Sequence, residues 1–434
     1  MLKKSLIALS LAITCLPAMA QTGNSASEID VNKIREIQSY FAEDAHRSHI
    51  LVPSDKTLYA WQNMSRFYRT ALIQREGAVS ELEYDLIPEI GKIEYQRNDG
   101  SKETLEGHLA KYPTDGFLVV HKGKIAFEYY SDTMRPFDLH NWYSSGKILG
   151  STMLAILETE GKVDVNKPVS YYLTELKDSV WDTVKVVEAL DMTTGLDSTE
   201  HDEPTRDSRT NPDQGWYRWA ASLDLFDDPR GLNETPIDVL RSMKRRQPAY
   251  SAYEYNSINT FVIDLIVERI TNQTLPELLS ETIWRPAGME SGAYIAVSDT
   301  GLPTSFGTMN STLRDMARFG MAYTPSWKVL SDTPAIPQSV IELIQKGGDP
   351  EIYKHGYLGP RTTELGFSGE QGITNRYQWD AVFADGDFWK KGVGGQGLYI
   401  SPDKDLVIVY FATGTGNDQE ETITREIAKY FSSN

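Results

Sequence analysis

The chain of 434 residues contains one cysteine, Cys15, and this scarcity limits the chemistry available to it. Outside the apolar N-terminal stretch that holds Cys15, there is no thiol for a disulfide or for nucleophilic attack. The seven histidines are scattered, and His140, His201 and His355 show neither a metal-ligand spacing nor a catalytic partner. We therefore expect no metal site.

Long apolar runs are also missing, because the run at residues 5–16 is too short to cross a bilayer comfortably. Lys3 and Lys4 precede this run, and Ala18-Met19-Ala20 follows it as a small-x-small cleavage site. Residues 1–20 therefore predict a signal peptide, with a buried N-terminal helix as the alternative. We expect a secreted, periplasmic protein with no membrane span in its mature chain.

Basic residues are outnumbered by acidic ones, 43 Lys and Arg against 61 Asp and Glu, which gives a formal charge of −18. A surface of this sign disfavours binding to nucleic acid and to anionic membranes. The charge says little about the substrate, because the site can differ from the average surface. Neither composition nor charge indicates an oligomeric state.

Several common catalytic motifs are absent, since no G-x-S-x-G elbow, no H-E-x-x-H pair and no phosphate-binding P-loop occurs. The segment 391–397 does contain G-x-G-x-x-G. A dinucleotide fingerprint needs a helix after it, whereas the pattern here predicts a strand. A glycine-rich strand suits close approach of a substrate to backbone donors, and a bulged strand at a sheet edge is the alternative.

Hydrophobic patterns divide the chain into two further regions. Residues 21–104 are polar and mixed, without sustained periodicity, and we expect them to pack on the main body. Residues 105–434 form the main domain, in which hairpins at 117–130 and 397–412 bracket a mostly helical lobe at about 150–330. This order predicts an α+β fold, with one antiparallel sheet built from both ends and a helical lobe inserted between them.

Serine-x-x-lysine occurs twice, and the context separates the two copies. Ser401 lies in the turn of the predicted C-terminal hairpin, which is typical of a structural position. Ser144 opens an amphipathic helix, so that Lys147 at i+3 shares its face. The amine can accept the hydroxyl proton if burial lowers its pKa, and the helix N-terminus offers N–H groups to an oxyanion. The alternative is a capping serine followed by a solvated lysine.

A second candidate is Tyr255, which comes just before an apolar helix beginning near Thr260. A tyrosine beside a lysine ammonium can act as a proton donor or acceptor. The alternative for Tyr255 is an aromatic residue of the core.

In this order, the motifs resemble those of the penicillin-recognising serine hydrolases over about residues 105–434. Ser144-Ser145-Gly146-Lys147 is similar to their S-x-x-K motif, and the segment 190–196, Leu-Asp-Met-Thr-Thr-Gly-Leu, is similar to their L-D-M-T-S-G-L. Tyr255-Asn256-Ser257 stands in the place of their Y-x-N motif, and the glycine-rich segment 391–397 in the place of K-T-G.

Three details are similar to the class C-type branch of this family, which includes the 6-aminohexanoate-dimer hydrolase-like enzymes. They are the segment that runs on from Tyr255 to Thr260, the segment from Leu313 to Gly320, and Gly394-Gly395-Gln396 with Ser401-Pro402 beyond it.

The resemblance implies a β-lactamase/transpeptidase-like fold, in which an antiparallel sheet is flanked by helices and the site lies between sheet and helical lobe. It also implies that Ser144 attacks an acyl carbonyl while Lys147 and Tyr255 transfer protons. Backbone N–H groups of Ser144 and of Val393 or Gly394 would hold the oxyanion. No cofactor is required.

Two departures from the family motifs bear on the substrate. Ser257 replaces the asparagine of Y-x-N, and Lys391 can stand for the lysine of K-T-G only if Gly392-Val393 replaces Thr-Gly, which leaves the strand register open. Ser257 stays a candidate substrate-binding residue, because its shorter side chain can still donate or accept a hydrogen bond. The lysine and hydroxyl of K-T-G help the family bind a β-lactam carboxylate, so their loss argues against an efficient β-lactamase. We expect an exported hydrolase of a small linear ester or amide. The alternatives are a DD-peptidase or weak β-lactamase acting on peptidoglycan-like substrates, and an inert binding protein of the same fold.

Overall fold

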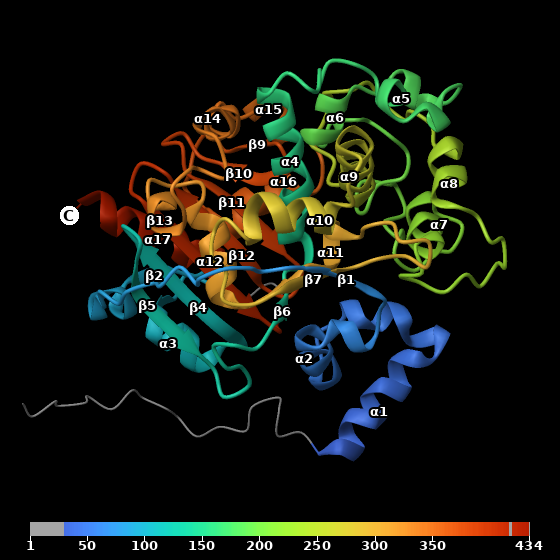
Figure 1. Cartoon of the computed structure of the whole chain (residues 1–434). Helices are drawn as coiled ribbons and strands as arrows, with labels where there is room; N and C mark the ends of the chain where they lie inside the picture. The colour runs from blue at the N-terminus through green and yellow to red at the C-terminus, as the bar shows by residue number, and fades with distance from the viewer. Residues whose placement is uncertain (1–29, 416–418, 434) are drawn as a thin grey trace, which may run out of the picture.

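The computed structural model describes residues 30–415 and 419–433, so the predicted signal peptide lies outside the described part. A seven-stranded antiparallel sheet stands at its centre, in the order β5-β4-β13-β12-β11-β10-β9 (Figure 1). Its strands are β4 (Thr114–His121), β5 (Lys124–Tyr130), β9 (Thr374–Arg376), β10 (Trp379–Val382), β11 (Phe388–Gly392), β12 (Gln396–Ser401) and β13 (Leu406–Ala412).

Strands from the two ends of the chain pair in this sheet, since β4 lies beside β13 with Val119 opposite Ile408. The two hairpins at residues 117–130 and 397–412 are those expected from the sequence. The predicted α+β fold, in which one antiparallel sheet unites both ends of the chain, is confirmed.

Both faces of the sheet are buried, because alternate side chains of each strand point to opposite sides. Leu118 and Val409 face one core, which they share with helices α4 (Lys147–Thr159) and α12 (Leu313–Met321). Phe117 and Ile408 face a second core, which helices α3 (Leu105–Lys111) and α17 (Glu420–Ser433) cover. This double burial explains why β4 and β13 are nearly continuous apolar runs.

A second sheet, which the sequence did not predict, joins the N-terminal segment to the main domain. Its order is β1-β7-β8-β6, from β1 (Thr70–Ile73), β7 (Ala293–Ala296), β8 (Asn310–Ser311) and β6 (His140–Asn141). These strands have two to four residues, too few for a readable alternation of polar and apolar side chains. A small hairpin, β2 (Glu94–Gln96) with β3 (Lys102–Thr104), completes the strands of the described residues.

The middle of the chain forms the helical lobe beside the sheet (Figure 1). Its central helix, α9 (Ser257–Thr271), packs against α4, and the asparagine before it, Asn256, accepts the N–H of Ile258 as an N-cap. The other helices of this lobe are α5 (Val169–Tyr172), α6 (Val186–Leu190), α7 (Gly215–Ser222), α8 (Pro236–Ser242) and α10 (Leu275–Leu279).

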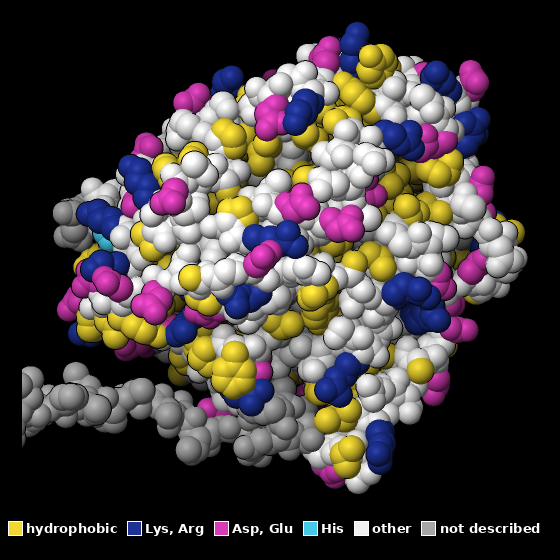
Figure 2. Space-filling model, viewed as in Figure 1, with side chains coloured by type: hydrophobic (Ala, Val, Ile, Leu, Met, Phe, Trp, Pro, Cys, Tyr) yellow, Lys and Arg dark blue, Asp and Glu magenta, His cyan; other side chains and the backbone are white. Residues whose placement is uncertain are grey.

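The remaining helices lie around these two units. They are α1 (Val31–Ala42), α2 (Asp55–Gln62), α11 (Ser305–Thr308), α13 (Trp327–Leu330), α14 (Gln338–Gln345), α15 (Pro350–Tyr353) and α16 (Leu358–Arg361). Within residues 30–415 and 419–433, no helix has the length and apolar character needed to cross a bilayer. Acidic and basic side chains are interspersed on the face seen in Figure 2.

Candidate active site

Ser144 lies in a 3₁₀ turn, Tyr143–Gly146, that leads directly into α4. The sequence predicted that Ser144 would open an α-helix, and the tighter turn improves the geometry, because residues i and i+3 eclipse each other in a 3₁₀ helix. Lys147 Nζ lies 3.3 Å from Ser144 Oγ. Ser144 is partly exposed, whereas Lys147 is fully buried.

The residue before the serine holds the turn in an unusual conformation. Tyr143 has a φ of 46°, in the left-handed region that non-glycine residues avoid. Its N–H donates to Asn141 Oδ1 at 3.1 Å, and its hydroxyl donates to the Ile50 carbonyl at 2.9 Å. Local strain that surrounding hydrogen bonds maintain is typical of functional turns.

Gly146 allows another segment to approach this turn. A Cβ at residue 146 would lie 2.3 Å from the carbonyl oxygen of Ser305 in α11. The glycine of Ser144-Ser145-Gly146-Lys147 therefore allows α11 to pack against the turn that carries Ser144.

The ammonium group of Lys147 has three hydrogen-bond acceptors, one for each of its N–H bonds. They are Ser144 Oγ at 3.3 Å, Ser257 Oγ at 2.6 Å and the carbonyl of Phe306 in α11 at 3.0 Å. Burial lowers the pKa of Lys147 to about 7, although the carboxylate of Glu200, 3.9 Å away, acts in the opposite direction. A large fraction of Lys147 is thus an uncharged amine near neutral pH, as a general base requires.

Glu200 is a site residue that the sequence analysis missed. It accepts hydrogen bonds from both the N–H and the hydroxyl of Ser257, and its other oxygen pairs with Arg209 at 2.9 Å. Burial alone would raise its pKa, but Lys147 and Arg209 hold the pKa of Glu200 at about 2. Ser257 therefore links the amine of Lys147 to a permanently ionised carboxylate.

Tyr255 lies between two lysines. Its ring centroid is 5.0 Å from Lys147 Nζ and 4.8 Å from Lys390 Nζ. Burial, together with the carboxylates of Asp380 and Glu200, raises the pKa of Tyr255 well above its usual value. The phenol is therefore a proton donor at neutral pH, which leaves Lys147 as the first base.

The strand register that the sequence left open places Lys390, and not Lys391, beside the site. Lys390 is fully buried and its Nζ donates to Asp380 Oδ1 at 2.6 Å, whereas Lys391 Nζ donates to Glu421 of α17 at 2.9 Å. Successive residues of β11 face opposite sides of the sheet. Lys390-Lys391-Gly392 thus occupies the place of K-T-G, with a lysine in place of its threonine.

Val393 and Gly394, the two candidates for the second oxyanion donor, follow β11 in its turn to β12. Val393 lines the cavity beside Ser144, while Gly394 packs against Trp61 of α2. Gly394 has a φ of 86°, and a Cβ there would lie 2.3 Å from the indole of Trp61. The glycine-rich turn therefore joins two interior strands rather than forming a sheet edge, and it places Val393 on the cavity that Ser144 also lines.

A cavity of about 70 Å³ opens beside Ser144, and side chains from three regions enclose it. The N-terminal segment supplies one wall, with Ile50, Leu51, Met64 and Tyr68. The helical lobe and α11 supply the rest, mainly with Trp216, Trp219, Phe226 and Phe306. The walls are largely aromatic and aliphatic, and the polar groups gather at Ser144, Glu200, Arg209 and Ser257.

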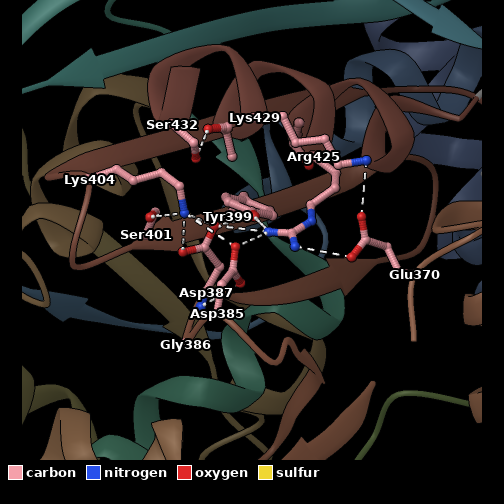
Figure 3. A network of polar contacts seen from close by, with 12 residues as sticks. Glu370, Asp385, Gly386, Asp387, Tyr399, Ser401, Lys404, Arg425, Lys429 and Ser432 are labelled. Atoms are coloured by element: carbon pink, nitrogen blue, oxygen red, sulfur yellow. Dashed lines mark hydrogen bonds and ion pairs between the residues drawn. The ribbon is translucent and has the colours of Figure 1, made fainter. Parts of the chain in front are cut away.

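The second serine-x-x-lysine pair lies elsewhere, on the far side of the sheet from this cavity. Lys404 Nζ donates to Ser401 Oγ at 3.2 Å and to Asp387 at 3.0 Å, and Arg425 of α17 donates to the same carboxylate at 3.1 Å (Figure 3). Ser401 is fully buried in this ion-pair network. The pair ties the terminal helix to the sheet, as expected of a structural position.

No set of three His, Cys, Asp or Glu side chains in the described ranges could hold a metal ion. His201 is the histidine that approaches the site, since its ring stacks at 6.5 Å from the ring of Tyr255. No pattern in the sequence indicated that these two residues lie close together.

Comparisons with known proteins agree with this arrangement. The profile of the Beta-lactamase family matches residues 102–430. A 6-aminohexanoate-dimer hydrolase of Paenarthrobacter ureafaciens is 30% identical over 313 residues, which cover 70% of this chain and 74% of that protein.

Solved structures show the same fold. A Bacillus anthracis protein described as a 6-aminohexanoate-dimer hydrolase superposes with a TM-score of 0.72 at 23% identity, covering 89% of this chain and 96% of its own. A class C beta-lactamase superposes with a TM-score of 0.53 at 17% identity, covering 74% of this chain and 92% of its own. The family and the β-lactamase/transpeptidase-like fold expected from the motifs are confirmed: the chain belongs to the beta-lactamase family and is a serine hydrolase of the amidase or esterase type.

Proposed function

We propose that this protein hydrolyses small linear amides or esters through an acyl-enzyme on Ser144. The observation that supports this most directly is the buried amine of Lys147, with a pKa of about 7, at 3.3 Å from Ser144 Oγ. A buried lysine of lowered pKa beside a serine is the arrangement that activates a hydroxyl without histidine.

In the proposed acylation, the neutral amine of Lys147 takes the hydroxyl proton as Ser144 Oγ bonds to the acyl carbon. The N–H groups of Ser144 and Val393 stabilise the oxyanion of the tetrahedral intermediate. Tyr255 then gives its phenolic proton to the departing nitrogen or oxygen, and the Lys147 ammonium returns a proton to Tyr255. Water cleaves the acyl-enzyme by the reverse transfers, which restores the Ser144 hydroxyl and releases a carboxylic acid.

Two observations favour a linear substrate over a β-lactam. Lys391, which stands where K-T-G has a threonine, donates to Glu421 and leaves the cleft without that hydroxyl. The cavity beside Ser144 is small and bounded by the N-terminal segment and by aromatic side chains. A narrow apolar recess with a few converging polar groups suits an extended acyl chain.

We also propose that the protein is exported. The basic, apolar and small-x-small order of residues 1–20 supports a cleaved leader. Expression of the complete chain in a Gram-negative host, followed by intact-mass measurement of the periplasmic fraction, should give a mature chain that begins at Gln21. A full-length product confined to the cytoplasm would refute export.

The test of the proposed activity uses 4-nitrophenyl butyrate, butyryl 4-nitroanilide and a penicillin. The wild type should hydrolyse the ester and the anilide with a higher kcat/KM than the penicillin. Ser144→Ala should lower kcat by roughly 10³-fold or more, because it removes the nucleophile. Ser401→Ala, the matched change in the other serine-x-x-lysine pair, should keep most of the activity. Equal activity of wild type and Ser144→Ala would refute the proposal.

A further inference from the structure

Two exposed arginines beside Tyr357 have no carboxylate partner among the described residues. Arg206 and Arg361 are both exposed, and their guanidinium carbons lie 5.1 Å and 5.7 Å from the ring centroid of Tyr357. Neighbouring arginines are paired, as Arg209 is with Glu200 and Arg246 with Glu254. Two unpaired cations on one aromatic ring are unexpected in a chain with a formal charge of −18.

A row of aromatic rings connects this pair of arginines to the catalytic tyrosine. The ring of Tyr357 lies 5.0 Å from the ring of His201, which in turn stacks at 6.5 Å from the ring of Tyr255. Burial, and the positive charges of Arg209, Lys147 and Arg361, lower the pKa of His201 to about 4. His201 is thus neutral at pH 7, and the positive charge of this region comes from the guanidinium groups.

Acidic groups nearby are already engaged. Asp202 accepts the N–H of Tyr357 at 2.6 Å, which fixes the ring under the two arginines. Burial raises the pKa of Asp202 to about 6, and the charges of Arg246 and Arg206 act against this rise. Its carboxylate lies beyond ion-pair distance of both Arg206 and Arg361, whose side chains are exposed.

Tyr255 gives its proton to the leaving group in the proposed mechanism, so the leaving group departs on the side of Tyr255. The row from Tyr255 through His201 to Tyr357 links that side of the site to Arg206 and Arg361. An anion attached to the leaving group would therefore reach Arg206 and Arg361, while the acyl chain occupies the cavity beside Ser144.

We propose that Arg206 and Arg361 form a subsite for a carboxylate on the leaving group, so that the preferred substrates are amides of amino acids or esters of hydroxy acids. This inference rests on the proposed function. Guanidinium groups bind carboxylates through paired N–H donors, and stacking on Tyr357 orients these donors in advance. Charge at a cleft rim also attracts an anionic substrate from solution.

The test compares three chromogenic esters: 4-nitrophenyl butyrate, the same ester with a carboxylate on the leaving group (3-carboxy-4-nitrophenyl butyrate), and mono-4-nitrophenyl succinate, which carries its carboxylate on the acyl side. The wild type should prefer the carboxylated leaving group over the neutral one in kcat/KM. Arg206→Gln with Arg361→Gln should reduce this preference about tenfold, mainly through KM. Arg35→Gln with Lys346→Gln, which removes two exposed charges elsewhere, should preserve the preference.

The outcomes separate this inference from the proposed function. If the wild type hydrolyses all three esters through Ser144 without preference, or if the arginine variant loses both butyrates equally, the subsite is refuted while the activity stands. If the arginine variant loses activity mainly on the succinate ester, the carboxylate belongs on the acyl side and the assignment is overturned. If no ester acylates Ser144, the proposed function itself fails.

Discussion

Lys147 Nζ lies closer to Ser257 Oγ, at 2.6 Å, than to the hydroxyl of Ser144, at 3.3 Å. Ser257 in turn donates to Glu200, so the amine of Lys147 is held by a second hydroxyl besides that of Ser144. This contact explains how a serine can stand where the family motif has an asparagine. It orients the amine while Glu200 opposes, without cancelling, the fall in the pKa of Lys147 that burial causes.

Removal of this hydroxyl should impair catalysis without unfolding the protein. Ser257→Ala leaves Lys147 with two acceptors, and we expect kcat to fall by about 10- to 100-fold, the range of a misoriented general base. Steady-state kinetics on 4-nitrophenyl butyrate measure the loss. Ser151→Ala, at a buried serine one helical turn after Lys147 in α4, is the matched control. An equal loss in both variants would show a packing effect and not a role for Ser257.

The acylation rate should depend on pH through Lys147. Since its pKa is about 7 and the neutral amine is the reactive form, the rate should rise from pH 6 to pH 8 and then level off. Glu200→Gln removes a carboxylate that raises this pKa, so the rising limb should move to lower pH, by about half to one unit. Single-turnover rates measured across pH test this. A shift to higher pH would contradict the assigned electrostatics.

Tyr255 should act as the proton donor to the leaving group. Its raised pKa keeps the phenol protonated, and Tyr255→Phe removes that proton while the ring stays between Lys147 and Lys390. We expect kcat to fall by about a hundredfold or more for an anilide, and less for a nitrophenyl ester, whose leaving group needs little protonation. Equal losses on both substrates would assign the residue another role.

The buried carboxyl group of Asp264, in α9, should lower the free energy of unfolding at neutral pH. It is fully buried, Ser305 donates to one of its oxygens at 2.5 Å, and burial raises its pKa well above the usual value. The carboxyl group ionises near pH 4 when the chain is unfolded, and its raised pKa moves ionisation to higher pH when the chain is folded, so stability falls as pH rises above about 4. Asp264→Asn should therefore raise the free energy of unfolding at pH 8, by about 1–2 kcal/mol.

Urea denaturation at pH 5 and pH 8 measures this effect, which should be larger at pH 8. Asp299→Asn, a change of the same kind at an exposed carboxylate, should alter stability little at either pH. If Asp264→Asn instead destabilises the protein more at pH 8 than at pH 5, Asp264 is ionised in the folded state and the prediction is wrong.

The contact between the N-terminal segment and the turn after β11 should require a glycine at residue 394. Gly394→Ala combines a left-handed φ with a clash against Trp61, so the turn that carries Val393 must move. We expect kcat/KM to fall at least tenfold together with a lower Tm. Gly301→Ala, at a left-handed glycine whose Cβ would meet nothing, controls for backbone strain alone and should keep its activity.

The sequence predicted those parts of the site that depend on local spacing. Ser144 and Lys147 are three residues apart in one turn, so their meeting follows from helical geometry. The position of Lys390 beside the site could not be predicted, because the face that a strand residue occupies depends on where the strand begins. Glycines on both sides of this strand left its start uncertain. Glu200 lies in a loop, and only tertiary packing brings it to Ser257, 57 residues along the chain.

The fold shows the same division. Continuous apolar runs predicted β4 and β13, and the family motifs indicated the type of domain. The four-residue strand β1 pairs with β7 more than two hundred residues away, and nothing in its local composition indicates a partner. The wall that the N-terminal segment contributes to the cavity likewise depends on long-range contacts, such as the hydrogen bond from Tyr143 to Ile50.

The most direct test of the central claim is intact-mass analysis of the mature protein after exposure to a serine-reactive fluorophosphonate and to 4-nitrophenyl butyrate, with Ser144→Ala and Ser401→Ala alongside. We predict one covalent adduct on the wild type and on Ser401→Ala, located at Ser144 by peptide mapping, and none on Ser144→Ala. An adduct that persists in Ser144→Ala, or a wild type that stays unlabelled while it hydrolyses the ester, would contradict an acyl-enzyme on Ser144.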